Sequence, residues 1–322
     1  MKNRNVKGIV KGLAAFAMPV VLFAIACVSF PNIQLENLPL LLRQSVAPCI
    51  IAWGVSFEFK AGNWDFSLGS VSVLSAIIGG NLCLQYFHGS IPALFFLCVC
   101  AAVLMGLITS AIYRFCKIPT ILVTIGMIFI YESLSTLIFK GKGVMLGREM
   151  TVFNNNLNSA ILFVILLAVA YLLYSKTKLS YNIRAAGKNP DVAFFNGIDV
   201  RKMKCAAMII AAAFAGCYGF YILGCNGVQR SVSGMGSMPM VFDAMMCVFM
   251  AFALEKLVNV VFGICIGAVT LQIIKFMLLA VGFPNQYNTS VIACIVLLLM
   301  VIDSGKIKLP KFAGRHKTAA NS

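Results

Sequence analysis

A few polar and ionisable side chains lie within or beside long apolar stretches of this sequence, where a charge is costly. Asp65, Glu132 and Asp243 are the carboxylates concerned, and Ser67 follows Asp65 at a helix start. A charged side chain at mid-membrane depth costs about 2.5–3.5 kcal/mol on insertion scales. Lining a water-accessible path for a polar solute would account for Asp65, Ser67, Glu132 and Asp243. For Asp65, capping the following helix is the alternative interpretation.

Covalent or metal chemistry has little support in the sequence. The 12 cysteines lie mostly in apolar runs, no C-x-x-C occurs, and the two histidines, His88 and His316, are far apart. Buried thiols acting as small hydrophobic side chains explain this pattern better than a metal site or a disulfide framework. We therefore predict no catalytic residue, no metal and no cofactor, which argues against an integral-membrane enzyme.

The composition is that of a membrane protein. The chain has 61% hydrophobic and only 11% charged residues, with a mean hydropathy of +0.93, whereas soluble domains are about 45–50% apolar and about 25% charged. The net charge of +16 comes from basic residues in short runs between apolar blocks. That distribution is typical of membrane proteins and argues against nucleic-acid binding.

The apolar stretches define the elements that must position the polar groups. Ten are present, at about 12–30, 45–57, 67–86, 91–112, 119–139, 159–174, 205–224, 241–254, 257–281 and 290–303. They predict an all-α integral membrane bundle of about ten transmembrane helices, or eight with two re-entrant segments. With the N-terminus inside, 20 basic residues fall on the inner side and five on the outer side. This asymmetry predicts that both termini are cytoplasmic.

The N-terminal basic and apolar run is longer than a signal-peptide core, so we interpret it as an uncleaved first helix. The chain is expected to form one transmembrane domain, 1–322. Its longest polar stretches are about 140–158, 175–204 and the basic tail 304–322. Each is too short for an additional domain, and no phosphate-binding loop for ATP is present.

The polar segment Ser180–Ile198 joins two apolar stretches and is expected on the cytoplasmic side. Asn189 can cap a helix, Pro190 suits its first position, and Asp191 favours the positive end of the helix dipole. Gly197 offers a left-handed stop. The residues predict a short helix with Ala193, Phe194 and Phe195 as an apolar face, which either contacts the lipid surface or binds a partner.

The segment from Thr177 to Ile198 resembles the cytoplasmic loop of the permease subunits of ABC importers, in the ribose-type branch. The matching positions are Ala185, Gly187, Asn189, Ala193, Gly197 and Ile198, while Ser180 stands where glycine is usual. Two further stretches agree in order, Asp65-Phe66-Ser67-Leu68-Gly69-Ser70 after Gly62, and Ile118 to Met127. A weaker match is Gly234-Met235-Gly236 followed by Asp243-Ala244.

The resemblance implies a permease of the bacterial plasma (inner) membrane that makes and breaks no covalent bond. It implies a homodimer, or a heterodimer with a paralogous permease, in the lipid bilayer. A separate cytoplasmic ABC ATPase would bind the coupling loop, and an extracytoplasmic binding protein would deliver a sugar or similar small polar solute. The loop residues implied are Ala185, Gly187, Asn189, Pro190, Asp191, Ala193, Gly197 and Ile198.

One stretch departs from the family pattern, and one alternative function stays open. The family usually has a run rich in glycine and serine at Phe252–Asn259, but the residues of this chain predict continuous helix there. Such a departure would fit a divergent permease that pairs with a different permease subunit. The alternative is a self-sufficient secondary transporter with Glu132, Asp243 or Asp65 as ion-coupling carboxylates. A pentose, a hexose, a signalling sugar and a nucleoside all remain open as the solute.

Overall fold

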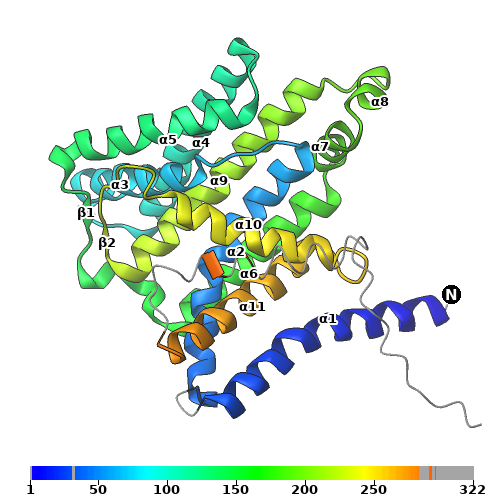
Figure 1. Cartoon of the computed structure of the whole chain (residues 1–322). Helices are drawn as coiled ribbons and strands as arrows, with labels where there is room; N and C mark the ends of the chain where they lie inside the picture. Colours follow the sequence, from blue (N-terminus) through cyan, green and yellow to red (C-terminus); the bar gives the residue numbers. More distant parts are fainter. Residues whose placement is uncertain (1, 31–32, 283–289, 292–293, 295–322) are drawn as a thin grey trace, which may run out of the picture.

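The described residues form a bundle of helices with one short pair of strands (Figure 1). The computed structural model describes residues 2–30, 33–282, 290–291 and 294. Its α-helices are α1 (Lys2–Ser29), α2 (Leu38–Ala61), α3 (Leu68–Tyr86), α4 (Ile91–Cys116), α5 (Thr120–Leu137), α6 (Asn156–Lys176), α7 (Lys178–Lys188), α8 (Pro190–Phe195), α9 (Val200–Asn226), α10 (Met238–Ala253) and α11 (Val260–Ala280).

Short irregular elements lie at one end of the bundle. Strands β1 (Val144–Met145) and β2 (Val228–Gln229) pair antiparallel, with Val144 opposite Gln229. The 3-10 turns are η1 (Leu35–Asn37), η2 (Ile138–Gly141), η3 (Arg148–Met150) and η4 (Val152–Asn154). Helices α7 and α8 lie at the opposite end (Figure 1). We call these two ends the β end and the α7–α8 end.

Seven helices within the described residues are long and apolar enough to cross a membrane. They are α2 with η1, α3, α4, α5 with η2, α6, α9 and α11. The stretch Phe16–Ser29 of α1 and helix α10 are shorter apolar helices. The predicted all-α membrane class is confirmed at this level. The tenth apolar stretch, 290–303, and the basic tail, 304–322, lie almost wholly outside the described residues, so the count of ten stays a prediction.

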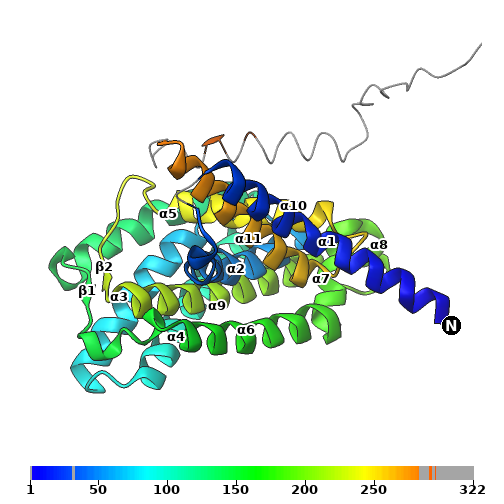
Figure 2. The same ribbon diagram turned by 90° about the horizontal axis from the view of Figure 1, so that it is seen from below.

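Two expected elements are longer than their apolar runs. The stretches 45–57 and 159–174 become α2 and α6, of 24 and 21 residues. Helix α2 continues through polar residues to Ala61, because Gly62 follows with φ 73° and ends the helix in the left-handed conformation. Helix α6 lies along an outer edge of the bundle (Figure 2).

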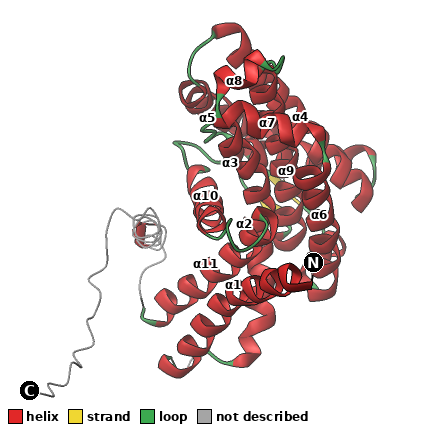
Figure 3. Ribbon diagram, turned by 90° about the vertical axis from the view of Figure 1, so that its right-hand side faces the viewer, coloured by secondary structure: helices red, strands yellow, loops and turns green. Residues whose placement is uncertain are grey.

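Helix α9 packs against α2, α3 and α4, and small residues permit the close contacts. A Cβ atom added to Gly216 would lie 2.7 Å from the Cβ of Ala102 on α4, and Gly54 of α2 faces the backbone of Ala211. In a membrane, helix association depends on such close packing, because lipid tails are as apolar as the side chains. Helix α1 lies apart from this centre and packs on α11 (Figure 3).

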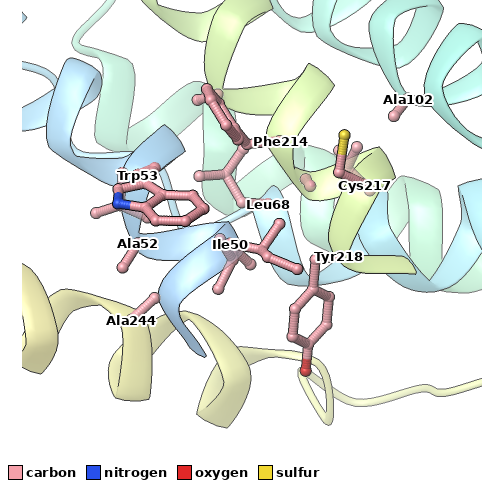
Figure 4. Packing of buried hydrophobic residues seen from close by; sticks show 14 of the residues in the cluster. Ile50, Ala52, Trp53, Leu68, Ala102, Phe214, Cys217, Tyr218 and Ala244 are labelled. Carbon is pink, nitrogen blue, oxygen red and sulfur yellow. The ribbon is translucent and has the colours of Figure 1, made fainter. Parts of the chain in front are cut away.

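Trp53 joins four helices in the buried core (Figure 4). Its ring stacks on Phe163 of α6 at a centroid distance of 5.7 Å and meets Phe214 of α9 edge-on at 6.3 Å. Its Nε1 donates to the carbonyl of Val261 on α11 at 3.2 Å. The indole therefore fills the space between helices and has its one donor satisfied.

The expectation of continuous helix over Phe252–Asn259 is wrong. Helix α10 ends at Ala253, and Asn259 begins α11 by accepting a hydrogen bond from the N–H of Val261 at 3.1 Å. Between them, Glu255 pairs with Lys60 at 2.7 Å, and the Lys60 ammonium lies 4.3 Å from the centre of the Phe252 ring. A cap and a long-range ion pair outweigh the local helix propensity of the segment.

Replacing Trp53 with alanine tests the core. We expect Trp53→Ala to lower the free energy of unfolding by about 3–5 kcal/mol, because it leaves a large cavity and removes the bond to Val261. The matched control is Trp64→Ala, since Trp64 is 47% exposed. Reversible unfolding of the purified chain in mixed detergent measures both. Equal losses for the two variants would contradict the central role of Trp53.

Candidate functional site

The predicted short helix in the polar segment is present as α8. The side chain of Asn189 accepts from the N–H of Val192 at 3.2 Å, and Pro190 occupies the first turn. Gly197 follows with φ 78°, and the N–H of Ile198 bonds the carbonyl of Ala193 at 3.0 Å. The helix thus begins with a side-chain cap and ends through a glycine turn.

The apolar face of α8 differs from the expectation in one residue. Phe194 and Phe195 are 70% and 85% exposed, whereas Ala193 is buried. The two rings meet edge-on with their centroids 6.1 Å apart, within the range of about 4.5–7 Å that is typical of aromatic pairs. Two adjacent aromatic side chains therefore project from the α7–α8 end with nothing in the described chain covering them, and Ala193 is the residue that packs inward.

Helix α7 is a second helix within the polar segment that the sequence analysis did not predict. It connects α6 to α8 and packs on the bundle. Thr177 caps it by accepting from the N–H of Ser180 at 3.2 Å, and the Ser180 hydroxyl donates to the carbonyl of Tyr174 at 2.8 Å. The Arg184 guanidinium lies over the rings of Tyr174 and Tyr181, at 4.9 and 4.5 Å. These contacts fix the angle at which α7 leaves α6.

Gly187 is the point at which α7 touches the transmembrane bundle. A Cβ atom at this position would overlap the carbonyl oxygen of Lys60, in the last turn of α2. No side chain can be accommodated there without moving one of the two helices. Ala185, Asn189, Pro190, Asp191 and Gly197 are all exposed, and Gly187 and Ile198 are partly buried.

A cavity of about 880 Å³ lies beside α8, between the end of α4 and the start of α9. Its lining includes Arg114, Phe115, Phe194 and Arg201. Asp199 also lines it and caps α9, accepting from the N–H of Lys202 at 3.0 Å. That backbone bond, with the Lys202 ammonium, lowers the pKa of Asp199 below its usual range. The surface is thus aromatic and mainly basic.

Three of the four predicted path residues, Asp65, Ser67 and Glu132, are buried in the bundle near a break in the helices. Residues 62–67 form an extended stretch that links α2 to α3 (Figure 1). Two threonines of α5 bond its backbone. Thr120 Oγ1 accepts from the N–H of Trp64 at 3.3 Å, and Thr124 Oγ1 bonds both the carbonyl of Trp64 at 3.2 Å and the N–H of Phe66 at 3.4 Å. These side chains replace the helical hydrogen bonds that the stretch lacks.

Asp65 and Ser67 form a buried turn just before α3. One carboxylate oxygen of Asp65 accepts from both the N–H and the hydroxyl of Ser67, at 2.7 and 2.6 Å. Asp65 therefore stabilises the turn that precedes α3. A capping side chain would instead accept from N–H groups inside the helix, and Asp65 does not. The hydroxyl of Ser67 points to Asp65, so the pair forms one polar unit.

Glu132 joins α5 to the start of α10. Its carboxylate accepts from the N–H of Met235 at 2.8 Å, and from the N–H and hydroxyl of Ser237 at 3.0 and 2.6 Å. A buried carboxylate that receives three donors at a helix N-terminus is well satisfied. Gly69 of α3 also touches Ser237, since a Cβ there would overlap the Ser237 carbonyl. Ser237 thus brings α3, α5 and α10 together.

Asp243 lies further along α10 and pairs with Lys275 of α11. Both side chains are partly buried, and the second carboxylate oxygen of Asp243 has no partner in the described part of the chain. The pair explains how two opposite charges can lie within apolar helices. The structure therefore gathers Asp65, Ser67 and Glu132 near the break and places Asp243 apart from them.

Sequence reasoning gave no role to Thr120 and Thr124, and it missed Glu58 and Asn63. Glu58 follows the apolar stretch 45–57, but α2 continues past it and buries it. The signal that could have revealed it is the flanking pair Phe57 and Phe59 in a helix that lacks a stop before Gly62. Within the described residues, no three His, Cys, Asp or Glu side chains are grouped to hold a metal ion.

Gly69 offers a test of the junction at Ser237. We expect Gly69→Ala to lower the free energy of unfolding by about 1–3 kcal/mol, because the added methyl group overpacks a backbone contact. Gly126→Ala on α5 is the control, since nothing lies within 4 Å of the added atom. Thermal unfolding in detergent compares them. A Gly69→Ala protein as stable as Gly126→Ala would refute the close contact.

Comparison with known proteins covers nearly the whole chain. The family model described as branched-chain amino acid transport system / permease component matches residues 37–301. The galactose/methyl galactoside import permease of Haemophilus influenzae is 23% identical, over 95% of this chain and 97% of its own length. The autoinducer 2 import system permease of Photorhabdus luminescens is 24% identical, over 95% and 91%.

A third relative extends the range of solutes named. The fructose import permease of Rhizobium meliloti is 21% identical, over 89% of this chain and 84% of its own length. No solved structure matches this chain. The similarity therefore rests on sequence along the full transmembrane region.

Proposed function

This chain belongs to the family of branched-chain amino acid transport system permease components, and from that premise we propose that it is the membrane-spanning subunit of a bacterial ATP-driven importer. The proposed solute is a sugar or a similar small polar molecule. The observation that carries this is the near full-length similarity to import permeases for galactose, autoinducer 2 and fructose. Transport, and no covalent chemistry, is the role of this subunit.

We place ATP hydrolysis in a separate cytoplasmic subunit that binds the coupling loop. The exposed Phe194 and Phe195, and the basic cavity next to them, supply an aromatic and charged surface for that partner. A movement of the partner would pass from α7 to α2 at Gly187, because no side chain separates the backbone of Gly187 from that of Lys60. The mechanism is alternating access, in which ATP binding to the partner shifts the population of inward- and outward-open states.

The charge distribution supports the orientation. With ten crossings, 20 basic residues lie on the cytoplasmic side and five on the outer side. The α7–α8 end is then cytoplasmic, together with both termini, in the bacterial plasma membrane. The β end faces outward, where a solute-binding protein would deliver its cargo.

A second permease copy, identical or paralogous, would complete the solute path. Helix α5 presents apolar residues to the exterior, among them Ile121, Leu122 and Phe129, and Gly126 leaves room for close approach. We propose this face for the dimer contact. Asp65, Ser67, Glu132 and Asp243 remain the proposed path residues, with their hydrogen bonds holding the path wall in shape.

The exposed ring pair tests ATPase docking. We expect Phe194→Ser combined with Phe195→Ser to weaken binding of the ATPase subunit, the one encoded next to this permease, roughly tenfold or more, as loss of central aromatic anchors does. The fold should be unaffected, because neither ring is buried. Tyr86→Ser at the β end, where Tyr86 is 65% exposed, is the control. Gly187 is unsuitable for this purpose, since its substitution would disturb α2.

Pull-down and solute uptake measure the effect in liposomes that contain the whole transporter. Unchanged ATPase affinity and uptake in the double variant would contradict docking through α8. A loss that appears equally in Tyr86→Ser would mean that the change acts through general damage.

The ion-coupled alternative makes a different prediction for the chain alone. In liposomes without an ATPase, we expect no sugar uptake when a proton or sodium gradient is imposed. Protein-free liposomes are the control. Gradient-driven uptake that Asp243→Asn abolishes would favour the secondary transporter.

A further inference from the structure

Glu58 is a fully buried acid with no hydrogen-bond partner among the described residues. It lies in the last turn of α2, where the residue is 1% exposed, and neither carboxylate oxygen receives a donor from the described part of the chain. Asn63, in the extended stretch 62–67, is 0% exposed, and within the described residues its Oδ1 also has no partner. Glu58 and Asn63 thus hold three buried acceptor oxygens that no described donor reaches.

The orientation of the Asn63 amide is fixed by α9. Its Nδ2 donates to the carbonyl of Lys204 at 3.1 Å, so Oδ1 is necessarily the free atom, since two oxygens facing each other would repel. Its backbone N–H bonds the carbonyl of Glu58 at 2.9 Å. The Asn63 residue is therefore held against the turn that carries the Glu58 side chain.

No ion pair neutralises Glu58 within the described residues. The charges of Asp65 and Lys204 act on its carboxyl in opposite directions, and Tyr113 of α4 and Cys205 of α9 are the other titratable groups that interact with it. An ionised Glu58 would be a buried charge with no hydrogen-bond donor among the described residues, which is strongly unfavourable.

We propose that Glu58 is a proton-binding site, with its neutral acid hydroxyl donating to Oδ1 of Asn63. One proton, taken from water, converts the carboxylate to the acid and satisfies atoms on both residues. The bond continues through Asn63 to Lys204, so the proton ties the end of α2 and the extended stretch to α9. It does so two residues from Lys60, against which Gly187 packs.

The proton site is independent of the transport proposal, because it concerns one carboxyl of this chain. If an ATPase failed to bind, the site would stand unaltered. If the site failed, family membership would be untouched. The two can therefore be tested separately on the purified chain.

Difference infrared spectroscopy of the full chain in lipid nanodiscs tests the proposal. We expect the wild type to show a protonated-carboxyl C=O band that is lost in Glu58→Gln and kept in Glu255→Gln, where the glutamate is exposed and paired with Lys60. Absence of any band difference between wild type and Glu58→Gln would overturn the proposal.

Unfolding of the same variants gives a second measurement. Glu58→Gln should melt at or above the wild-type temperature, because its amide can donate to Asn63 as the acid does, whereas Glu58→Leu should melt lower. Sodium chloride and choline chloride should give the same wild-type melting temperature. A stabilisation specific to sodium, and lost in Glu58→Gln, would show that a metal cation occupies the oxygens and would overturn the proton assignment.

Discussion

A backbone that leaves the helix inside a membrane protein must find hydrogen bonds within the protein itself, and the stretch 62–67 imposes this requirement on its surroundings. Thr120 and Thr124 bond its peptide groups from α5, and Asn63 reaches α9. Asp65 and Ser67 close the turn before α3. The break is therefore not a weak point, since three separate elements converge on it. The polar residues of this apolar chain are concentrated where regular helix ends.

Close backbone contact complements this polar framework. Gly69, Gly187 and Gly216 each leave no room for a side chain and Gly54 leaves little, and each lies between helices that are distant in sequence. In lipid, such contacts supply much of the attraction between helices, because apolar side chains gain little by leaving the acyl chains. Carboxylates then orient the packed helices, as Glu132 does at the start of α10. Packing sets the distances between the helices, and the charged hydrogen bonds set their positions along one another.

The predictable part of the structure was local. Helices followed from apolar run length, and α8 followed from Asn189, Pro190 and Gly197, because caps and stops act through residues a few positions away. Contacts between distant segments were beyond reach of the same reasoning. The helical appearance of Phe252–Asn259 gave no hint of Lys60, which holds Glu255 across the chain. Likewise, nothing beside Glu132 in sequence pointed to Ser237, and the end of the apolar run at residue 57 gave no sign that α2 continues to Ala61 and buries Glu58.

The bond between Glu132 and Ser237 has a mechanical meaning. Three hydrogen bonds attach the residues just before α10, Met235 and Ser237, to Glu132 of α5, so α5 cannot slide along the bundle without taking that segment with it. Gly234 and Met235 both have positive φ values, of 68° and 63°, which glycine adopts readily and other residues seldom do. Because Glu132 also bonds the N–H of Met235, the carboxylate holds this left-handed turn against α5. A shift of α5 would therefore reach the start of α10 through one side chain.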